Sequence, residues 1–194
     1  MAQVYSVNAV GYVNLNLPTG FSMIANQFVQ SSYTLASLIP NPPPATVVYK
    51  FTGSSYTINT FDDLDLVWTP NPNETIDLGS GVFISLPSPT TITFVGEVPQ
   101  GTLSTPTPAG FSIKSSQVPQ AGTVSALGLQ GQPADSIYKY VNNGSGGGGY
   151  QIFTFDDLDL VWTPSEPTVN VGESFFLFKA PGGSTTWTRT FSVN

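Results

Sequence analysis

The sequence contains neither cysteine nor histidine in its 194 residues. Disulfide bonds, zinc sites with Cys or His ligands, haem with those axial ligands, cysteine nucleophiles and Ser–His triads are therefore excluded. No stretch comes near the roughly 18 consecutive apolar residues that a transmembrane helix needs, so we expect no membrane insertion. The lack of cysteine leaves the cellular compartment open, because extracellular and cytosolic proteins both include cysteine-free examples.

Charge is also scarce, at 9% of residues against about 25% in a typical soluble protein. Few bases are present, so we expect no nucleic-acid binding: Lys50, Lys114, Lys139, Lys179 and Arg189. Disorder is not expected either, since disordered chains combine low hydrophobicity with high charge. A surface built from hydroxyl and amide side chains suits a secreted or cell-surface protein, or one that packs against copies of itself.

What the sequence does contain is an internal repeat. The eleven residues of Thr60–Pro70 recur without a change at Thr154–Pro164. Looser matches at offsets of 89 to 93 residues flank this block: Pro18–Ser22 with Pro108–Ser112, Tyr49–Phe51 with Tyr138–Tyr140, and Leu78–Ile84 with Val171–Leu177. The block itself is offset by 94, because the loop Asn142–Gly149 adds five residues. The chain is therefore predicted to hold two copies of one unit, residues 1–97 and 98–194.

The pattern within each copy predicts β-strands almost throughout. The clearest alternation runs from Val4 to Leu17 and places these residues on one face: Tyr5, Val7, Ala9, Val13, Leu15 and Leu17. Helix is expected only as single turns, at Leu35–Ile39 and Val124–Leu127. Short strands separated by Pro- and Gly-rich turns predict an all-β fold. We expect two tandem, internally duplicated β-sandwich-like units related by pseudo-twofold symmetry.

The two ends of the chain are related in sequence. Phe191–Asn194 nearly repeats Tyr5–Asn8, and in this sequence no copy of the repeat stands before the N-terminal strand. Two arrangements satisfy this pattern. The N-terminal strand folds back and pairs within its own chain, or it adds to the sheet edge of a neighbouring subunit and builds a head-to-tail fibre.

The acids are concentrated in the two identical blocks. Half of the twelve lie there: Asp62, Asp63, Asp65, Asp156, Asp157 and Asp159. The remaining six acids against five bases leave a net charge of −1 outside the blocks. If the first two aspartates of a block form a turn, its three carboxylates can converge as calcium ligands. The spacing is not that of an EF-hand, and a solvated turn or a subunit contact are the alternatives.

The same blocks contain two of the three tryptophans. Alternation predicts that Leu64, Leu66 and Trp68 share one strand face and fill the core, and Trp162 corresponds to Trp68. Trp187 lies between threonines near the C-terminal end and is expected to be exposed. Exposed aromatic rings would suit polysaccharide binding. We expect no enzymatic activity, because paired carboxylates on one strand do not face each other across a cleft as in a glycosidase.

Three segments carry a family resemblance: Tyr5–Asn14, Pro18–Ser22 and Gly172–Phe176. They resemble uncharacterised secreted β-repeat proteins of environmental bacteria, and the resemblance covers most of both copies. It implies export and a β-rich fold, and it implies no activity. In those proteins a signal peptide ends just before a stretch like Ala2–Tyr5. The sequence therefore fits a mature secreted form, with its signal peptide removed and an initiator methionine added.

Two hypotheses of function follow from these observations. Low charge, the tandem repeat and the unmatched terminal strands favour an extracellular structural subunit. Such a subunit would self-assemble into a fibre or surface layer through β-strand addition. The alternative is a secreted carbohydrate-binding module. No cofactor is expected apart from calcium at the aspartates named above.

Overall fold

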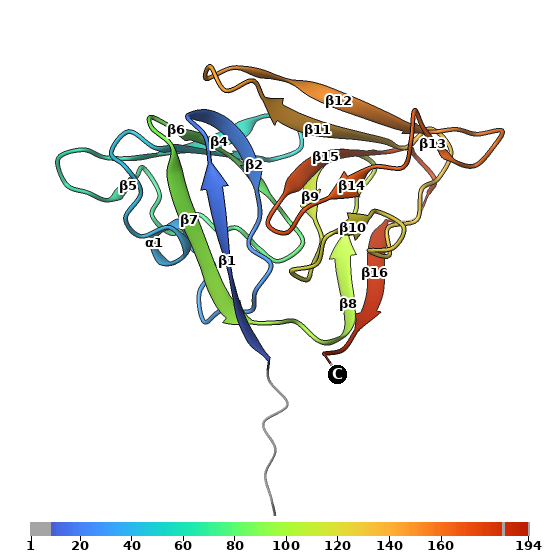
Figure 1. Ribbon diagram of the computed structural model, residues 1–194, viewed down its shortest axis with the longest axis horizontal. Coiled ribbons are helices and arrows are strands. Elements are labelled where there is room, and N and C mark those ends of the chain that lie inside the picture. Colours follow the sequence, from blue (N-terminus) through green and yellow to red (C-terminus); the bar gives the residue numbers. More distant parts are fainter. Residues whose placement is uncertain (1–8, 184, 194) are drawn as a thin grey trace, which may run out of the picture.

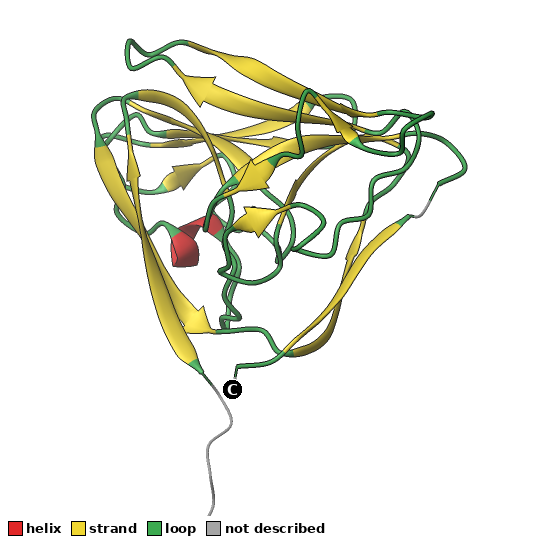
Figure 2. Ribbon diagram, turned by 45° about the vertical axis from the view of Figure 1, so that its right-hand side comes forward, coloured by secondary structure: helices red, strands yellow, loops and turns green. Residues whose placement is uncertain are grey.

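The computed structural model describes residues 9–183 and 185–193, which form strands and loops almost throughout (Figures 1 and 2). The prediction of an all-β fold is confirmed. Helix in the described residues is confined to α1 (Leu35–Leu38), which matches the predicted single turn there. Across this part of the chain, no helix is long and apolar enough to cross a membrane.

Two five-stranded antiparallel sheets form the body of the molecule. The first has the order β2 (Gly20–Ile24), β6 (Val82–Leu86), β3 (Val47–Phe51), β4 (Tyr56–Phe61) and β5 (Trp68–Thr69). The second has the order β9 (Gly110–Ser115), β15 (Ser174–Lys179), β11 (Ser136–Asn142), β12 (Gly148–Phe155) and β13 (Trp162–Thr163). We call the chain up to residue 97 the first half and the rest the second half. The predicted boundary thus falls between the strands of the two sheets.

A two-stranded antiparallel ribbon descends from each sheet (Figure 1). The first ribbon pairs β1 (Val10–Leu17) with β7 (Thr90–Glu97), and the second pairs β8 (Gly101–Pro106) with β16 (Thr186–Phe191). A shorter pair joins β10 (Gly122–Thr123) to β14 (Thr168–Val169). Each of the eight residues of β1 therefore has a partner in β7 of the same chain.

Each half has its own apolar core between its sheet and its ribbon. The first ribbon turns Val13, Leu15 and Leu17 towards the first core, as the alternation predicted, while Val10 and Tyr12 face outwards. The part of that prediction on residues 4–8 lies outside the described residues. The second core is built from these buried residues: Val124, Leu127, Leu129, Ile137, Trp162, Val169, Phe175, Leu177 and Trp187. Each such side chain stabilises the fold by roughly 1.5–3 kcal/mol when fully buried.

The opposite faces of the two sheets pack against each other. Met23 and Phe83 of the first sheet form one buried cluster with Ile113 and Phe176 of the second. Because successive side chains of a strand point to opposite faces, a strand buried on both faces is apolar at neighbouring positions. The run Ser174–Lys179 of β15 shows this, since five of its six residues are buried.

Polar contacts at the boundary between the halves are buried and matched. The amide of Ala25 donates to the carbonyl of Gly172 at 2.9 Å, and the amide of Ser115 donates to the carbonyl of Gly79 at 3.1 Å. Gln27, which is fully buried, accepts from the Gly172 amide at 2.8 Å through Oε1. These bonds fix the two halves in one register, since a buried amide without a partner is costly.

We predict that Gln27→Ala lowers the free energy of unfolding by about 1–3 kcal/mol, because it leaves the buried Gly172 amide without its acceptor. Urea unfolding followed by tryptophan fluorescence measures this change. Gln130→Ala is the matched control: Gln130 is exposed, and its loss should change stability by less than about 0.5 kcal/mol. Equal losses in the two variants would contradict the structural role given to Gln27.

Candidate functional site

The middle of each identical block, residues 62–67 and 156–161, forms an exposed loop, one between β4 and β5 and one between β12 and β13. In the first loop Asp62 Oδ1 accepts hydrogen bonds from the amides of Leu64 and Asp65, at 2.8 and 2.9 Å. Asp156 makes the same two bonds at the same distances in the second loop. These backbone donors lower the pKa of both aspartates, since they stabilise the charged carboxylate. The first aspartate of each block therefore caps its own turn.

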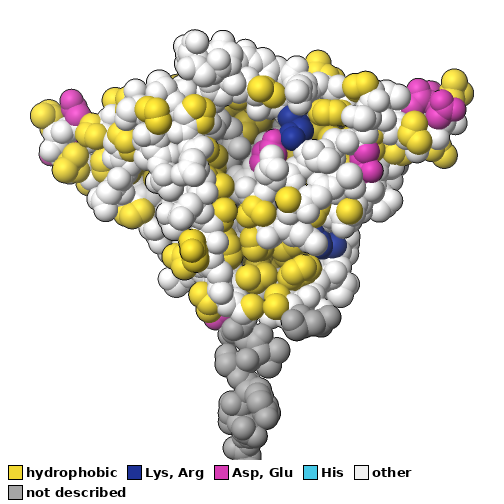
Figure 3. Space-filling model, in the orientation of Figure 1, with side chains coloured by type: hydrophobic (Ala, Val, Ile, Leu, Met, Phe, Trp, Pro, Cys, Tyr) yellow, Lys and Arg dark blue, Asp and Glu magenta, His cyan; other side chains and the backbone are white. Residues whose placement is uncertain are grey.

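The prediction that Leu64 and Leu66 fill the core is wrong. Leu64 is 85% exposed, and Leu158 at the same place in the second loop is 87% exposed. The backbone of Leu66 has a φ of +53°, and that of Leu160 has a φ of +54°. This left-handed conformation interrupts the extended strand, so the alternation that begins at Trp68 cannot be continued backwards through the loop. The acidic and apolar side chains lie together at two opposite ends of the molecule (Figures 1 and 3).

The tryptophans are all buried. The prediction that Trp68 and Trp162 are core residues is confirmed, with exposed fractions of 2% and 7%. The prediction that Trp187 is exposed is wrong: it is 1% exposed, and its Nε1 donates to the carbonyl of Leu127 at 2.9 Å. The flanking threonines belong to the outer face of β16, and Trp187 belongs to the inner face, as period-two alternation requires.

The carboxylates of the blocks do not gather into a ligand shell. Within residues 9–183 and 185–193, no group of three or more acids is close enough to hold a metal ion. The first aspartate of each loop is already engaged by backbone amides. Calcium binding therefore stays a prediction for these residues: Asp62, Asp63, Asp65, Asp156, Asp157 and Asp159. It requires each loop to close around the ion.

A network of aromatic rings fills the space between the two sheets, and we call it the aromatic layer. Neighbouring ring centroids lie 5.0–6.5 Å apart with interplanar angles of 48–89°. Such tilted and edge-to-face pairs are favourable arrangements for aromatic quadrupoles. Its members are Phe21, Tyr49, Phe51, Tyr56 and Phe83 of the first half and Phe111, Tyr138, Tyr140, Tyr150, Phe176 and Phe178 of the second.

One side of the aromatic layer opens into a groove of about 470 Å³. The first sheet contributes Phe21, Tyr49, Tyr56, Ile58 and Phe83 to its lining, and the hairpin of β11 and β12 contributes Tyr140 and Tyr150. None of these lining side chains carries a charge at neutral pH. The groove therefore offers ring faces, ring edges and phenol groups to a ligand.

The phenol groups of the groove are free to bond. The hydroxyls of Tyr56, Tyr140 and Tyr150 make no hydrogen bond to any described residue of the chain. Burial, followed by the nearby phenols of Tyr56 and Tyr140, raises the pKa of Tyr150 to about 12. Burial also raises the pKa of Tyr56. Both groups stay neutral at physiological pH, so each can donate one hydrogen bond and accept others.

Three lysines near the sheets form ion pairs outside the groove. Lys50 bonds to Glu74 at 2.9 Å and Lys139 to Glu173 at 3.0 Å. Lys179 and Asp135 form a third ion pair, which is buried. None of these groups lines the groove. Its chemistry is consequently that of stacking and neutral hydrogen bonding.

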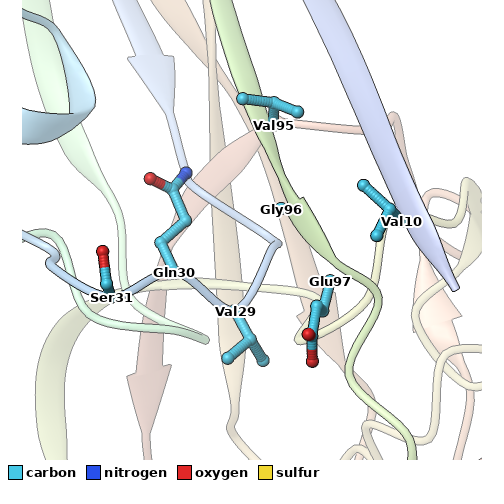
Figure 4. Close-up of a pocket in the computed structure, with 7 residues that line it drawn as sticks. All are labelled: Val10, Val29, Gln30, Ser31, Val95, Gly96 and Glu97. Atoms are coloured by element: carbon cyan, nitrogen blue, oxygen red, sulfur yellow. The ribbon is translucent and has the colours of Figure 1, made fainter. Parts of the chain in front are cut away.

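A second hollow, of about 510 Å³, lies at the lower end of the first ribbon (Figure 4). The ribbon turns Val10 and Tyr12 outwards there, with exposed fractions of 72% and 71%. Val95 stands directly opposite Tyr12 in the pairing register and is also exposed. We call Val10, Tyr12 and Val95 the outer face of the first ribbon.

The groove was not predicted from the sequence, although part of its signal is visible there. Tyr49-Lys50-Phe51 and Tyr138-Lys139-Tyr140 place rings at alternate positions, which shows that one strand face is aromatic. Nothing in the pattern says which other face covers it. The pairing of one aromatic sheet with another becomes visible only in the structure.

Comparison with known proteins gives no relative whose role could be carried over. No family model matches the chain, and neither a curated protein nor a solved structure shows significant similarity to it. The resemblance to secreted β-repeat proteins stays a prediction.

If the loops bind calcium, removal of the ion should lower the melting temperature, because an ion that binds only the folded state stabilises it. A hundredfold excess over the dissociation constant adds about 2.7 kcal/mol per site. Thermal unfolding with calcium and with a chelator measures this effect. The double variant Asp63→Asn, Asp157→Asn should abolish the difference. The same melting temperature with calcium and with chelator for the unaltered protein would contradict the calcium prediction.

Proposed function

We propose that this protein is a secreted binding module for neutral carbohydrate, with the groove as its binding site. The observation that carries the proposal is a lining of rings and free phenols without charge. Sugar rings present apolar C–H faces together with hydroxyls at their rims. The C–H faces would stack on the rings of the groove, and the hydroxyls would pair with the phenols.

The absence of charge from the lining selects against charged sugars. A carboxylate or sulfate in the groove would lose part of its hydration, and no lysine or arginine lines the groove to compensate it. A wholly apolar ligand fits poorly as well. It would cover the hydroxyls of Tyr56, Tyr140 and Tyr150 and leave them unpaired. A neutral ligand with hydroxyl groups satisfies both requirements.

Export and internal duplication belong to the same proposal. The low charge and the polar neutral surface support an extracellular location. The matching strand orders of the two sheets support a tandem duplication. Ring pairs also correspond: Phe21–Phe83 at 6.1 Å and 89° has its counterpart in Phe111–Phe176 at 6.2 Å and 89°. We propose binding without catalysis.

Substitutions in the groove should weaken carbohydrate binding, and loss of a whole ring should weaken it more than loss of a hydroxyl alone. Tyr56→Phe removes one hydroxyl and should raise the dissociation constant about 3- to 10-fold, whereas Tyr56→Ala also removes a ring and should exceed tenfold. Isothermal titration with soluble neutral glucans, xylans and mannans measures these constants. Tyr12→Ala, on the first ribbon, is the control that should leave them unchanged. Failure of the unaltered protein to bind any neutral glycan would overturn the proposal.

A second candidate function is self-assembly, favoured by the outer face of the first ribbon. Val10 and Val95 line part of the hollow of Figure 4, and together with Tyr12 they form an exposed apolar patch. In the described chain β1 has β7 as its sole strand partner, which leaves its other edge available for β-strand addition. We propose a second copy of the chain as the occupant, because the patch is apolar and Glu97 is the one charged residue among the described residues that line the hollow beside it.

Substitution of patch residues by lysine should prevent self-association, because each lysine would place a charge in the buried contact between subunits. The double variant Tyr12→Lys, Val95→Lys is expected to sediment as a monomer at concentrations where the unaltered protein associates. Val141→Lys, an exposed position in the second half, is the control that should associate normally. Unaltered protein that remains a monodisperse monomer, by sedimentation and by negative-stain microscopy, would contradict self-assembly.

A further inference from the structure

The two halves differ most clearly in one hairpin. Nine residues separate Tyr140 from Tyr150 in the second half, whereas four separate Phe51 from Tyr56 in the first. The five additional residues lengthen both strands. β11 and β12 gain the cross-strand pairs Val141–Gly149 and Asn142–Gly148, and β3 and β4 end without them.

The longer hairpin reaches over the first half and is held there. The Nδ2 atom of Asn142 donates to the carbonyls of Thr19 and Phe21, each at 2.9 Å. Gly146 lies beside Gly20 in a parallel bridge. A Cβ atom at Gly20 would lie 2.6 Å from the Gly146 Cα, so the approach depends on glycine at position 20.

The corresponding place in the second half is uncovered. Gly110 aligns with Gly20 and has the same φ of +85°, yet among the described residues no atom beyond its chain neighbours lies within 4 Å of a Cβ built on it. The short hairpin of the first half therefore does not reach the second sheet there. In the second half the ring of Phe178 packs against the ring of Phe111 instead, with 5.0 Å between the two centroids. In the first half Ser85 takes the place of Phe178, opposite Phe21 in the strand register.

The held hairpin forms a wall of the groove. Tyr140 lies 6.5 Å from Phe21 and 5.4 Å from Phe83 by ring centroids, and Tyr150 lies 5.6 Å from Tyr140. Interplanar angles between neighbouring rings of the lining run from 48° to 89°. Rings so tilted surround a ligand and cannot form the flat platform that a crystalline polysaccharide surface would need.

We infer that the inserted hairpin, held to β2 by Asn142, turns one of two corresponding aromatic faces into a groove for one soluble carbohydrate chain. The inference rests on the proposed carbohydrate binding and narrows it in two ways. Each protein molecule binds one carbohydrate chain in spite of the repeated fold. The carbohydrate that it binds is a single dissolved chain and not the surface of a crystalline polysaccharide. Asn142 is the positioning residue, because it bonds to the backbone carbonyls of Thr19 and Phe21, at the start of β2, and does not line the groove.

The matched glycines allow a sharp test. Gly20→Ala and Gly110→Ala introduce the same backbone strain, since both residues have a φ of +85°, but only the first displaces the hairpin. Isothermal titration with soluble cello-, xylo- and manno-oligosaccharides should give one site for the unaltered protein. Gly20→Ala should weaken binding at least tenfold, and Gly110→Ala should leave it unchanged. Asn142→Ala should also weaken binding about tenfold.

Deletion of residues 143–147 restores the length of the shorter hairpin and should abolish binding. If this deletion variant fails to fold, the glycine and Asn142 variants decide alone. Sedimentation with microcrystalline cellulose and chitin should leave the protein in solution. Two sites per molecule, equal affinities in the two glycine variants, or binding only to the insoluble polymers would overturn the inference while carbohydrate binding stands. Absence of binding to every soluble and insoluble neutral glycan would instead overturn the proposed function.

Discussion

Packing of one aromatic sheet face against another holds this molecule together. Each five-stranded sheet has one face on the core of its own half, and its other face is apolar too. Exposing that second face to water would be costly, so each sheet covers the other. Edge-to-face ring pairs contribute about 0.5–1.5 kcal/mol each beyond their buried area. Because the two faces do not cover each other completely, rings and phenols remain accessible along one side, and that remainder is the groove.

Much of the fold could be predicted, because period-two alternation in the sequence indicates the strands and the side chains of each strand that face the core. The inward face of β1 at Val13, Leu15 and Leu17 and the burial of Trp68 follow from that rule. The same rule failed at Leu66, because a left-handed backbone residue breaks the alternation without leaving a signal in the residue type. The candidate site was harder still. Alternating rings show that a face is aromatic, but the partner of that face lies in the other half of the chain.

The repeat is informative both where it is exact and where it is broken. The identical blocks keep two exposed loops alike, each with one aspartate capping the turn and leucines facing water. The broken part is the hairpin of β11 and β12, whose longer turn begins at Asn142 and continues through several glycines. Symmetric packing would give two similar faces. The insertion makes them different, and it is this difference that gives the groove its second wall.

The central claim is that a neutral soluble carbohydrate binds between the rings of the groove. Nuclear magnetic resonance with ring-labelled tyrosine tests it most directly, because each ring reports on its own surroundings. On titration with the oligosaccharide that binds best, the signals of Tyr56, Tyr140 and Tyr150 should shift and saturate together at one ligand per chain, while those of Tyr12 and Tyr33 stay in place. Unchanged groove signals, or shifts confined to Tyr12 on the ribbon, would contradict the account.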